Sequence, residues 1–391
     1  MIQKVAKGFF LILFFGFLIA VAILSVAKED VKSSYAENRS YEQFSKPTKE
    51  TILNGEWFAD FETYSKDQII YREKIIQTYY KTLDSLQVKE RNDFVVGEDS
   101  FVMPINNYLS EASLNNCQNY GQAQVEAMSI IADAAGEYGG QVLYVNIPNK
   151  NDLYSEKYPE HYYAREDANQ MERASIVDKA KAAGIHVVET YDLLAEHKDE
   201  YIYYNTDHHF TIKGGYYVYK AILEKINELN DGQDLTFPDW EELDVQRNDS
   251  RMAGSYLRVW GDSKSIDVDY MEYAIPYDMP EYVRTDNGNE SDRPLFSLSS
   301  TAYTSFMGGD TGNTVIDTNR EELPSVLYVG FSFTNVLEVL SVYNFDTMES
   351  LDPRHWDGSI CEYIKESQPD YVVIVRDDIY EGNKQYKGRV R

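Results

Sequence analysis

The feature of this sequence that most constrains its fold is a repeated alternation between short apolar runs and helical patterns. Buried-strand candidates lie at residues 141–147, 185–189, 325–329 and 370–375. Such short, nearly continuous apolar runs are typical of strands covered on both faces. Helical patterns separate them, over about 121–138, 166–183, 191–198, 214–229, 334–342 and 359–366. The alternation predicts an α/β fold of three layers, with a parallel sheet between two layers of helices.

Two other regions have patterns of their own. The apolar spacing over 54–86 predicts helix, and 94–102 predicts a small hairpin that turns at Gly97. Residues 236 to about 322 are rich in Asp, Asn, Ser, Gly and Tyr and have no strong period. We expect an irregular insertion of loops and short strands there.

The N-terminus carries an uncharged run from Gly8 to Ala27, preceded by Lys4 and Lys7. Twenty helical residues span about 30 Å, the hydrocarbon thickness of a bilayer. Signal-peptide apolar regions are shorter, about 7–15 residues, although Ser25-Val26-Ala27 does resemble a cleavage site. The length favours a retained transmembrane anchor over removal, and the two lysines predict a cytoplasmic N-terminus with the body outside the cell.

This organisation predicts an anchor over 1–29, a polar stalk over 30–50 and an extracellular domain over 51–391. The net charge of −28 opposes a role on nucleic acid, because phosphate contacts need Lys and Arg. Soluble cofactors such as ATP and NAD are not at hand outside the cell, so we expect none.

The chain has only two cysteines, Cys117 and Cys361. Two cysteines exclude a disulfide framework and a Cys-rich zinc site. Outside the cell they could pair with each other, which the sequence leaves open.

Three residues are candidates for nucleophilic catalysis. Ser332 follows an apolar strand and Gly330, and precedes a helical pattern. A serine at such a turn projects beyond the sheet, and the helix start offers free N–H groups to an oxyanion. Asp207 and His209 precede another helix. Because ligands bind beyond the carboxyl ends of parallel strands, we expect Ser332 as nucleophile, His209 as base and Asp207 as its orienting carboxylate at one edge.

Two alternatives stand beside this hypothesis. His208 and His209 could bind a metal, but no carboxylate-rich or Cys motif nearby completes a site, so we expect no metal. Ser263, within Gly261-Asp262-Ser263, is a second candidate nucleophile. No helical pattern follows it and it lies in the irregular insertion, so Ser332 is favoured.

The stretch Asp207-His208-His209-Phe210-Thr211 resembles the signature of the DHHW family, with Phe210 in place of Trp. That family is similar to the SGNH-hydrolase-like proteins of alginate O-acetylation. Further segments resemble the family in the same order. They are Asp67 to Arg72 (Asp-Gln-x-x-x-Arg), the hairpin from Asn92 to Val102, Pro148-Asn149-Lys150 (Pro-x-Lys) and Gly330-Phe331-Ser332-Phe333 (Gly-Asp-Ser-Phe in the family).

The resemblance covers about residues 50–380 and implies an SGNH-hydrolase-like fold with a triad of Asp207, His209 and Ser332. It implies an O-acetyltransferase or esterase that acts on extracellular polysaccharide, with a multi-pass membrane acyltransferase as partner. Phe331 replaces the family's Asp, which together with the acidic, Tyr-rich insertion motivates the alternative of a non-catalytic polysaccharide-binding or assembly component. Lys150 would stabilise charge at the site or cap a strand edge, and the structural role is favoured.

Overall fold

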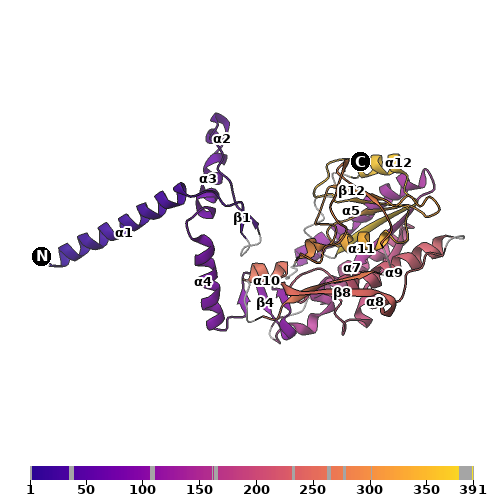
Figure 1. Ribbon diagram of the computed structural model, residues 1–391, viewed down its shortest axis with the longest axis horizontal. Coiled ribbons are helices and arrows are strands. Elements are labelled where there is room, and N and C mark those ends of the chain that lie inside the picture. Colours follow the sequence, from indigo (N-terminus) through magenta and orange to yellow (C-terminus); the bar gives the residue numbers. More distant parts are fainter. Residues whose placement is uncertain are drawn as a thin grey trace. The chain divides into compact units, whose positions relative to one another are not determined.

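The computed structural model describes residues 2–34, 39–105, 111–160, 162, 166–230, 234–261, 266–275, 279–300, 302–377 and 390 (Figure 1). The side chains of 2–4, 111–120 and 166–172 are outside this description. The chain forms two compact units. One comprises 1–94 with 257–266, and the other comprises 95–256 with 267–391.

The first unit begins with α1 (Ile2–Ala27), of which Val5–Ala27 is long and apolar enough to cross a membrane. A two-stranded pair follows, β1 (Ser33–Ser34) and β2 (Arg39–Ser40). The remaining elements are α2 (Lys49–Leu53), α3 (Glu56–Asp67), α4 (Arg72–Ser85) and β3 (Glu90–Arg91). α3 and α4 confirm the helical pattern predicted over 54–86, whereas α2 lies before it.

The segment that we predicted to be a polar stalk makes specific contacts with α3. Arg39 Nη1 donates to Asp67 Oδ2 at 2.9 Å, and the Trp57 indole donates to the Ser45 carbonyl at 2.9 Å. Gln68 accepts from the Val31 N–H at 3.0 Å. The Asp-Gln pair of the family-like segment therefore holds Val31 and Arg39 at the C-terminal end of α3.

The second unit is built on a central sheet of eight strands, in the order β11-β10-β12-β14-β13-β15-β6-β7 among the described residues. Neighbours from β14 to β7 are parallel, whereas β12, β10 and β11 extend the sheet antiparallel. In chain order the strands are β6 (Gln141–Ile147), β7 (His186–Glu189), β10 (Val283–Asp286), β11 (Asn289–Glu290), β12 (Asn313–Asp317), β13 (Val326–Val329), β14 (Thr347–Leu351) and β15 (Tyr371–Asp377). The sheet is thus mixed and mostly parallel, and three of its strands come from the predicted irregular insertion.

Helices cover both faces of this sheet. In β6, Leu143 and Val145 pack into one buried cluster and Val142 and Tyr144 into the other, as the two-residue period of a strand requires. The first cluster includes residues of α8 (Tyr191–Glu196), α9 (Ile212–Leu229) and α11 (Thr334–Ser341). The second includes residues of α5 (Glu111–Gly136), α7 (Glu166–Ala182) and α12 (Ile360–Ser367). The three-layer prediction is confirmed.

Local signals explain several of the boundaries. Thr211 caps α9, since its hydroxyl accepts from the Gly214 N–H at 3.3 Å. The expected hairpin at 94–102 is present as β4 (Phe94–Val96) and β5 (Val102–Pro104). α5 begins at Glu111, ten residues before the predicted start. The insertion also contributes the antiparallel pair β8 (Asp244–Met252) and β9 (Asp269–Ile275), and α10 (Ser255–Trp260).

The carboxyl ends of adjacent parallel strands meet at one edge of the sheet. β13 ends just before Gly330, and β15 and β6 end in register, with Asp377 opposite Ile147. The short helix α6 (Lys150–Leu153) starts three residues after β6. Ser332, Asp377 and Lys150 are therefore brought to this edge by three neighbouring strands.

We expect a pH-dependent stability from Glu338, which lies buried in α11 and accepts hydrogen bonds from Thr334 and Ser350. Burial raises the pKa of Glu338 to about 7. Between pH about 4.5 and about 7 the folded chain holds a proton that the unfolded chain has lost, so stability falls as pH rises through this window, by about 3 kcal/mol. Glu338→Gln should abolish this fall.

Thermal unfolding of the full chain at pH 5 and pH 8 measures the effect. The exposed Glu224, on α9, provides the matched control, and Glu224→Gln should retain the wild-type pH dependence. An equal loss of midpoint between the two pH values in wild type and Glu338→Gln would contradict the assignment.

Candidate active site

Ser332 sits in the tight turn between β13 and α11. Gly330 permits this turn, because a Cβ there would lie 2.6 Å from Thr334 Cγ2 and 3.0 Å from the Val375 carbonyl oxygen. Ser332 is only half-buried, so its hydroxyl is within reach of a ligand. Within the described residues, the backbone N–H groups of Ser332 and Phe333 donate to no acceptor. They are available to a negative charge that develops beside the hydroxyl.

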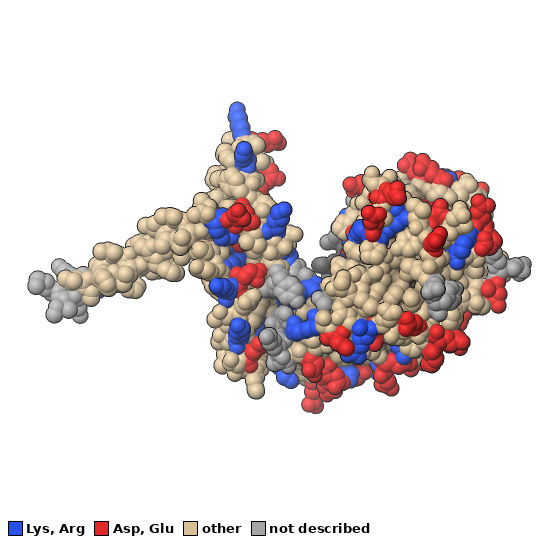
Figure 2. Space-filling model, in the orientation of Figure 1, with Lys and Arg blue, Asp and Glu red and all other residues tan. Residues whose placement is uncertain are grey.

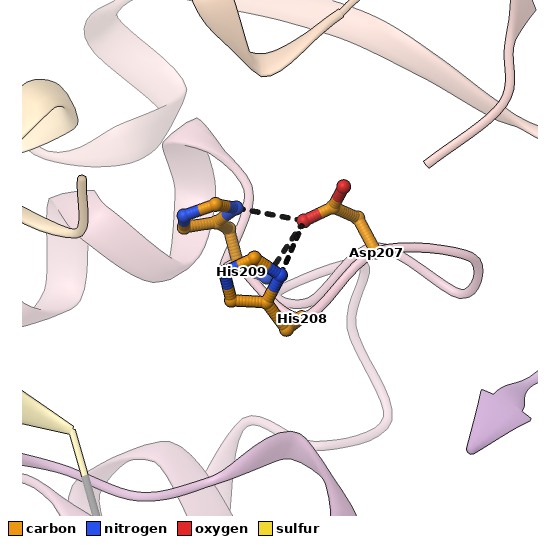
Figure 3. A group of neighbouring side chains, drawn as sticks. All are labelled: Asp207, His208 and His209. Atoms are coloured by element: carbon orange, nitrogen blue, oxygen red, sulfur yellow. Dashed lines mark hydrogen bonds and ion pairs between the residues drawn. The ribbon is translucent and has the colours of Figure 1, made fainter. Parts of the chain in front are cut away.

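The structure brings the three predicted side chains into one line of hydrogen bonds. The Ser332 Oγ lies 2.7 Å from His209 Nε2. His209 Nδ1 lies 2.7 Å from Asp207 Oδ1, as Figure 3 shows. Asp207 and His209 are 3% and 6% exposed, so the hydroxyl is the accessible end of the line. This is the arrangement in which a histidine can take a proton from a serine while a carboxylate orients the ring.

The Asp207 carboxylate is satisfied on both oxygens. Besides the imidazole, Oδ1 accepts from the His209 backbone N–H at 3.1 Å, and Oδ2 accepts from the Ser255 N–H at 2.6 Å. Burial alone would raise the pKa of this carboxyl, but the His208 and His209 rings and these hydrogen bonds hold it well below its usual range. Asp207 is therefore a carboxylate at neutral pH, as an orienting group must be.

Buried charges of opposite sign hold the turn that precedes Asp207. Asp269, on β9, accepts from the Asn205 N–H at 2.7 Å and from the Thr206 N–H at 2.8 Å. From the other side the Lys150 ammonium donates to the carbonyls of Tyr204 at 3.2 Å and Asn205 at 2.9 Å. Burial lowers the pKa of Lys150 to about 7, against the opposing effect of Asp269 and Asp207. The structure thus shows Lys150 binding the backbone of this turn.

An aromatic ring from the insertion covers His209. Tyr303 stacks face to face on the imidazole, with centroids 3.7 Å apart and planes inclined by 6°. Phe333 lies on the ring at 4.9 Å, and its own ring meets Phe210 edge-on at 5.1 Å. Phe210, which stands where the family has Trp, is fully buried, so it supports Phe333 rather than offering a surface to a ligand.

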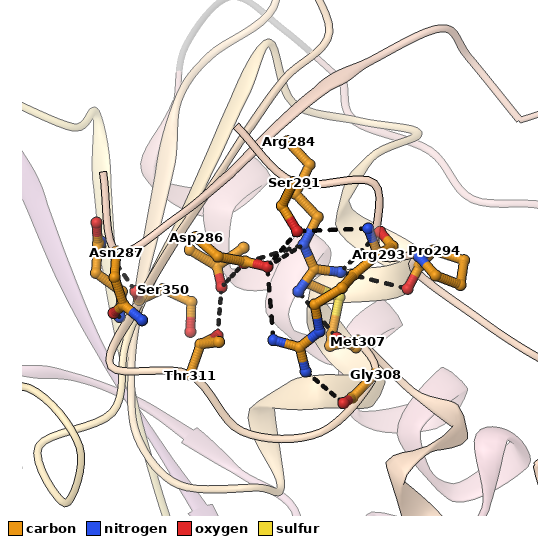
Figure 4. Close-up of polar contacts among 12 residues, drawn as sticks. Arg284, Asp286, Asn287, Ser291, Arg293, Pro294, Met307, Gly308, Thr311 and Ser350 are labelled. Carbon is orange, nitrogen blue, oxygen red and sulfur yellow. Dashed lines mark hydrogen bonds and ion pairs between the residues drawn. The ribbon is translucent and has the colours of Figure 1, made fainter. Parts of the chain in front are cut away.

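The loop that carries Tyr303 is tied to β10 by a polar cluster (Figure 4). Arg284 is 2% exposed and donates to Asp286 at 3.0 Å. The same guanidinium donates to backbone carbonyls on both sides of the loop, those of Arg293 at 3.2 Å and Met307 at 2.9 Å. This cluster holds the loop at Arg293 and at Met307, and Tyr303 lies between these two positions. The sequence analysis assigned no role to Tyr303, Asp269 or Arg284.

Phe331, the residue before the nucleophile, has two cations close to its ring. The guanidinium carbons of Arg354 and Arg376 lie 4.9 Å and 4.5 Å from its ring centroid. Cations favour the face of an aromatic ring, so the ring positions both arginines beside the turn. Arg354 also donates to Asp310 at 2.7 Å and to Asp352 at 2.6 Å. At the same edge, burial raises the pKa of Asp377 to about 6.

The sequence also offered a second nucleophile, a cysteine pair and a metal site. Ser263 lies outside the described residues. The side chain of Cys117 does too, so the pairing of Cys117 with Cys361 stays as open as the sequence left it. Among the described residues, two groups could bring three ligands to a metal, namely Asp207, His208 and His209, and Asp310, Asp352 and His355. In the first, His209 faces Ser332 and the Asp207 oxygens are engaged; in the second, Arg354 already binds both carboxylates. We assign no metal to either group.

Comparison with known proteins supports this description of the fold. Residues 108–265 match the family model described as SGNH hydrolase-like domain, acetyltransferase AlgX. This segment contains Asp207 and His209 and ends before Ser332. A search of curated proteins gives no match.

Solved structures match over most of their own length. A DHHW family protein from Eubacterium siraeum superposes with a TM-score of 0.62 at 21% identity, covering 77% of this chain and 97% of that one. PatB1 of Bacillus cereus superposes with a TM-score of 0.61 at 15% identity, covering 73% and 95%. The chain thus has an SGNH hydrolase-like fold. The predicted resemblance to the DHHW family and to alginate O-acetylation proteins is confirmed.

We expect Asp269→Asn to slow the reaction of Ser332 with phenylmethylsulfonyl fluoride by about tenfold or more. The carboxylate of Asp269 accepts hydrogen bonds from two N–H groups, and the NH2 group of an amide would face one of them as a second donor. Losing that hydrogen bond costs about 1–3 kcal/mol and displaces the turn before Asp207. The labelling rate follows from intact mass. Asp244→Asn, at an exposed position of β8, is the control that should react at the wild-type rate, and equal rates for both variants would contradict the role of Asp269.

Two substitutions of Tyr303 distinguish the effect of its ring from the effect of its hydroxyl. Tyr303→Phe should keep the labelling rate within about threefold, whereas Tyr303→Leu should lower it by about tenfold, the equivalent of one aromatic stacking interaction. The same mass measurement applies, with circular dichroism to confirm that each variant is folded. A Tyr303→Phe variant as slow as Tyr303→Leu would show that the hydroxyl matters instead of the ring.

Proposed function

We propose that this protein is a membrane-anchored, extracellular serine O-acyl (acetyl) transferase or esterase that acts on a cell-surface or secreted polysaccharide. The observation that carries the proposal is the hydrogen-bonded line from Asp207 through His209 to Ser332. Burial of the carboxylate and imidazole, with the hydroxyl accessible at the sheet edge, matches what acyl transfer by a serine requires.

In the first half-reaction, His209 Nε2 takes the Ser332 proton while Oγ bonds to the carbonyl carbon of the acyl donor. The charge on the carbonyl oxygen is met by the N–H groups of Ser332 and Phe333. The protonated imidazole, oriented by Asp207, then gives its proton to the leaving oxygen as the bond from the acyl carbon to that oxygen breaks. An acyl-Ser332 ester remains.

In the second half-reaction, an acceptor hydroxyl gives its proton to His209 and attacks the acyl-Ser332 carbonyl. Collapse of the intermediate returns the proton to Ser332 Oγ and releases the acylated acceptor. A sugar hydroxyl as acceptor gives transfer, and water gives hydrolysis. These steps need no metal and no soluble cofactor.

The substrate class and the location rest on the resemblance and on α1. The matched family model is an acetyltransferase model named for AlgX, which supports acetylation of a polysaccharide. The α1 segment Val5–Ala27 suits a retained anchor, with the body outside the cell. There the acyl group would come from a carrier delivered through the membrane by a multi-pass acyltransferase.

The test is turnover of a chromogenic acetyl ester by the full chain in detergent. Ser332→Ala should lower kcat by about a thousandfold or more and abolish the acetyl mass adduct, because the nucleophile is lost. Ser263→Ala, the matched serine control, should keep wild-type turnover.

A non-catalytic polysaccharide-binding component would give a different pattern. It would bind glycan equally well with and without Ser332→Ala, and it would form no acyl adduct with any activated ester. That outcome would overturn the catalytic proposal.

A further inference from the structure

The first unit exposes large apolar side chains that a soluble unit would bury. No residue of α4 is buried, and in α3 only Asp67 is. Tyr71, at the N-cap of α4, is 62% exposed, and Ile75 and Tyr79 within the helix are 60% and 57% exposed. Their spacing of four residues places them on one face of the helix. Exposed patches of this kind mark contact with a partner or a membrane.

α3 carries a second patch, and it is aromatic. Phe58 and Phe61 are exposed, and Trp57 stacks on Phe61 with centroids 5.1 Å apart. The Trp57 N–H is satisfied by the Ser45 carbonyl, so the ring is free to be surrounded by apolar material at no cost in hydrogen bonding. Trp and Tyr are the residues enriched at the level of lipid headgroups.

Hydrogen bonds place both helices at the end of the apolar segment. The Ile70 N–H, between α3 and α4, donates to Ser25 Oγ near the end of α1 at 2.9 Å. Lys28 donates to Gln68 Oε1 at 3.1 Å. The segment Val5–Ala27 spans about 34 Å as a helix, the thickness of the hydrocarbon core and little more. The corner between α3 and α4 is therefore at the depth where hydrocarbon gives way to headgroups.

Charge points to lipid contact by insertion. Residues 1–94 contain thirteen basic and thirteen acidic residues, so the net charge of −28 lies entirely in 95–391. On the face drawn in Figure 2, α1 is tan, and red and blue atoms begin at its C-terminal end. A neutral, aromatic surface gains little from anionic headgroups and much from apolar burial.

We propose that the exposed faces of α3 and α4 lie in the interfacial layer of the bilayer that α1 crosses, with lipid as their occupant. This rests on the retained anchor of the proposed function and is independent of its chemistry. The two helices then form a second membrane contact, which restricts how the rest of the first unit can rotate about the axis of α1.

An environment-sensitive label on α4 tests this directly. The full chain, with Cys117 and Cys361 replaced by Ser, is reconstituted in phosphatidylcholine nanodiscs with the fluorophore NBD on Ile75→Cys or on Gln77→Cys. Gln77 is the matched control, because it is exposed on the opposite side of α4. Ile75→Cys should give blue-shifted emission that acyl-brominated lipid quenches, and Gln77→Cys should give emission typical of water without quenching.

Two further measurements separate the alternatives. Trp57→Phe should remove most of the bromolipid quenching of intrinsic emission, whereas Trp240→Phe, in the second unit, should leave it. Water-like emission at both labelled positions overturns the proposal, as does shielding at Ile75 that bromolipid leaves unquenched, since a second copy or another protein then covers the face. If mass shows that the mature chain lacks 1–27, the anchor is absent. The emission of NBD on Ile75→Cys should then still shift to the blue when vesicles are added. No shift with vesicles overturns the proposal that this face of α4 binds lipid.

Discussion

The candidate site depends on a buried turn whose backbone is only partly paired with other backbone groups. Residues 204–206 lead into Asp207. The Tyr204 N–H donates to the His209 carbonyl and the Asn205 carbonyl accepts from the Val102 N–H, but the N–H groups of Asn205 and Thr206 have carboxylate acceptors instead of backbone ones. Asp269 accepts the N–H groups and Lys150 donates to the carbonyls. A buried unpaired backbone group costs about 1–3 kcal/mol, so these two side chains fix the turn by energetic necessity. The position of Asp207, and through it that of His209, follows from this arrangement.

Three ionisable side chains are buried close together at this turn. Asp207, Asp269 and Lys150 are each at most 3% exposed. Burial opposes the charged form of each, and it raises the pKa of Asp269 as it lowers that of Lys150. The ammonium lies within electrostatic reach of both carboxylates and offsets part of this cost. Removing one member would leave the others uncompensated, which is why Lys150 is more than a cap on a strand edge.

Much of this could be predicted from the sequence. The apolar runs at 141–147 and 325–329 predicted the strands β6 and β13. They also predicted the edge of the sheet at which the site lies, because ligands bind beyond the carboxyl ends of parallel strands. Gly330 before a helical pattern then indicated where Ser332 would lie, and the helical pattern after His209 did the same for the Asp207 segment. The antiparallel extension was missed, although Asn287-Gly288, both at positive φ between β10 and β11, is a strong hairpin signal. Tyr303 and Asp269 reach the site only through long-range packing, for which no local pattern exists.

At the edge of the sheet, the parallel strands and the antiparallel extension contribute different residues to the site. The parallel strands carry Ser332 and Lys150, whereas the ring above His209 arrives on a loop fastened by Arg284 to a strand outside that set. Loops tolerate change in length and sequence far better than the strands that support them. The loop that carries Tyr303 could therefore change during evolution while the hydrogen bonds from Asp207 through His209 to Ser332 stay intact. Relatives with the same chemistry could then differ in the substrates that reach it.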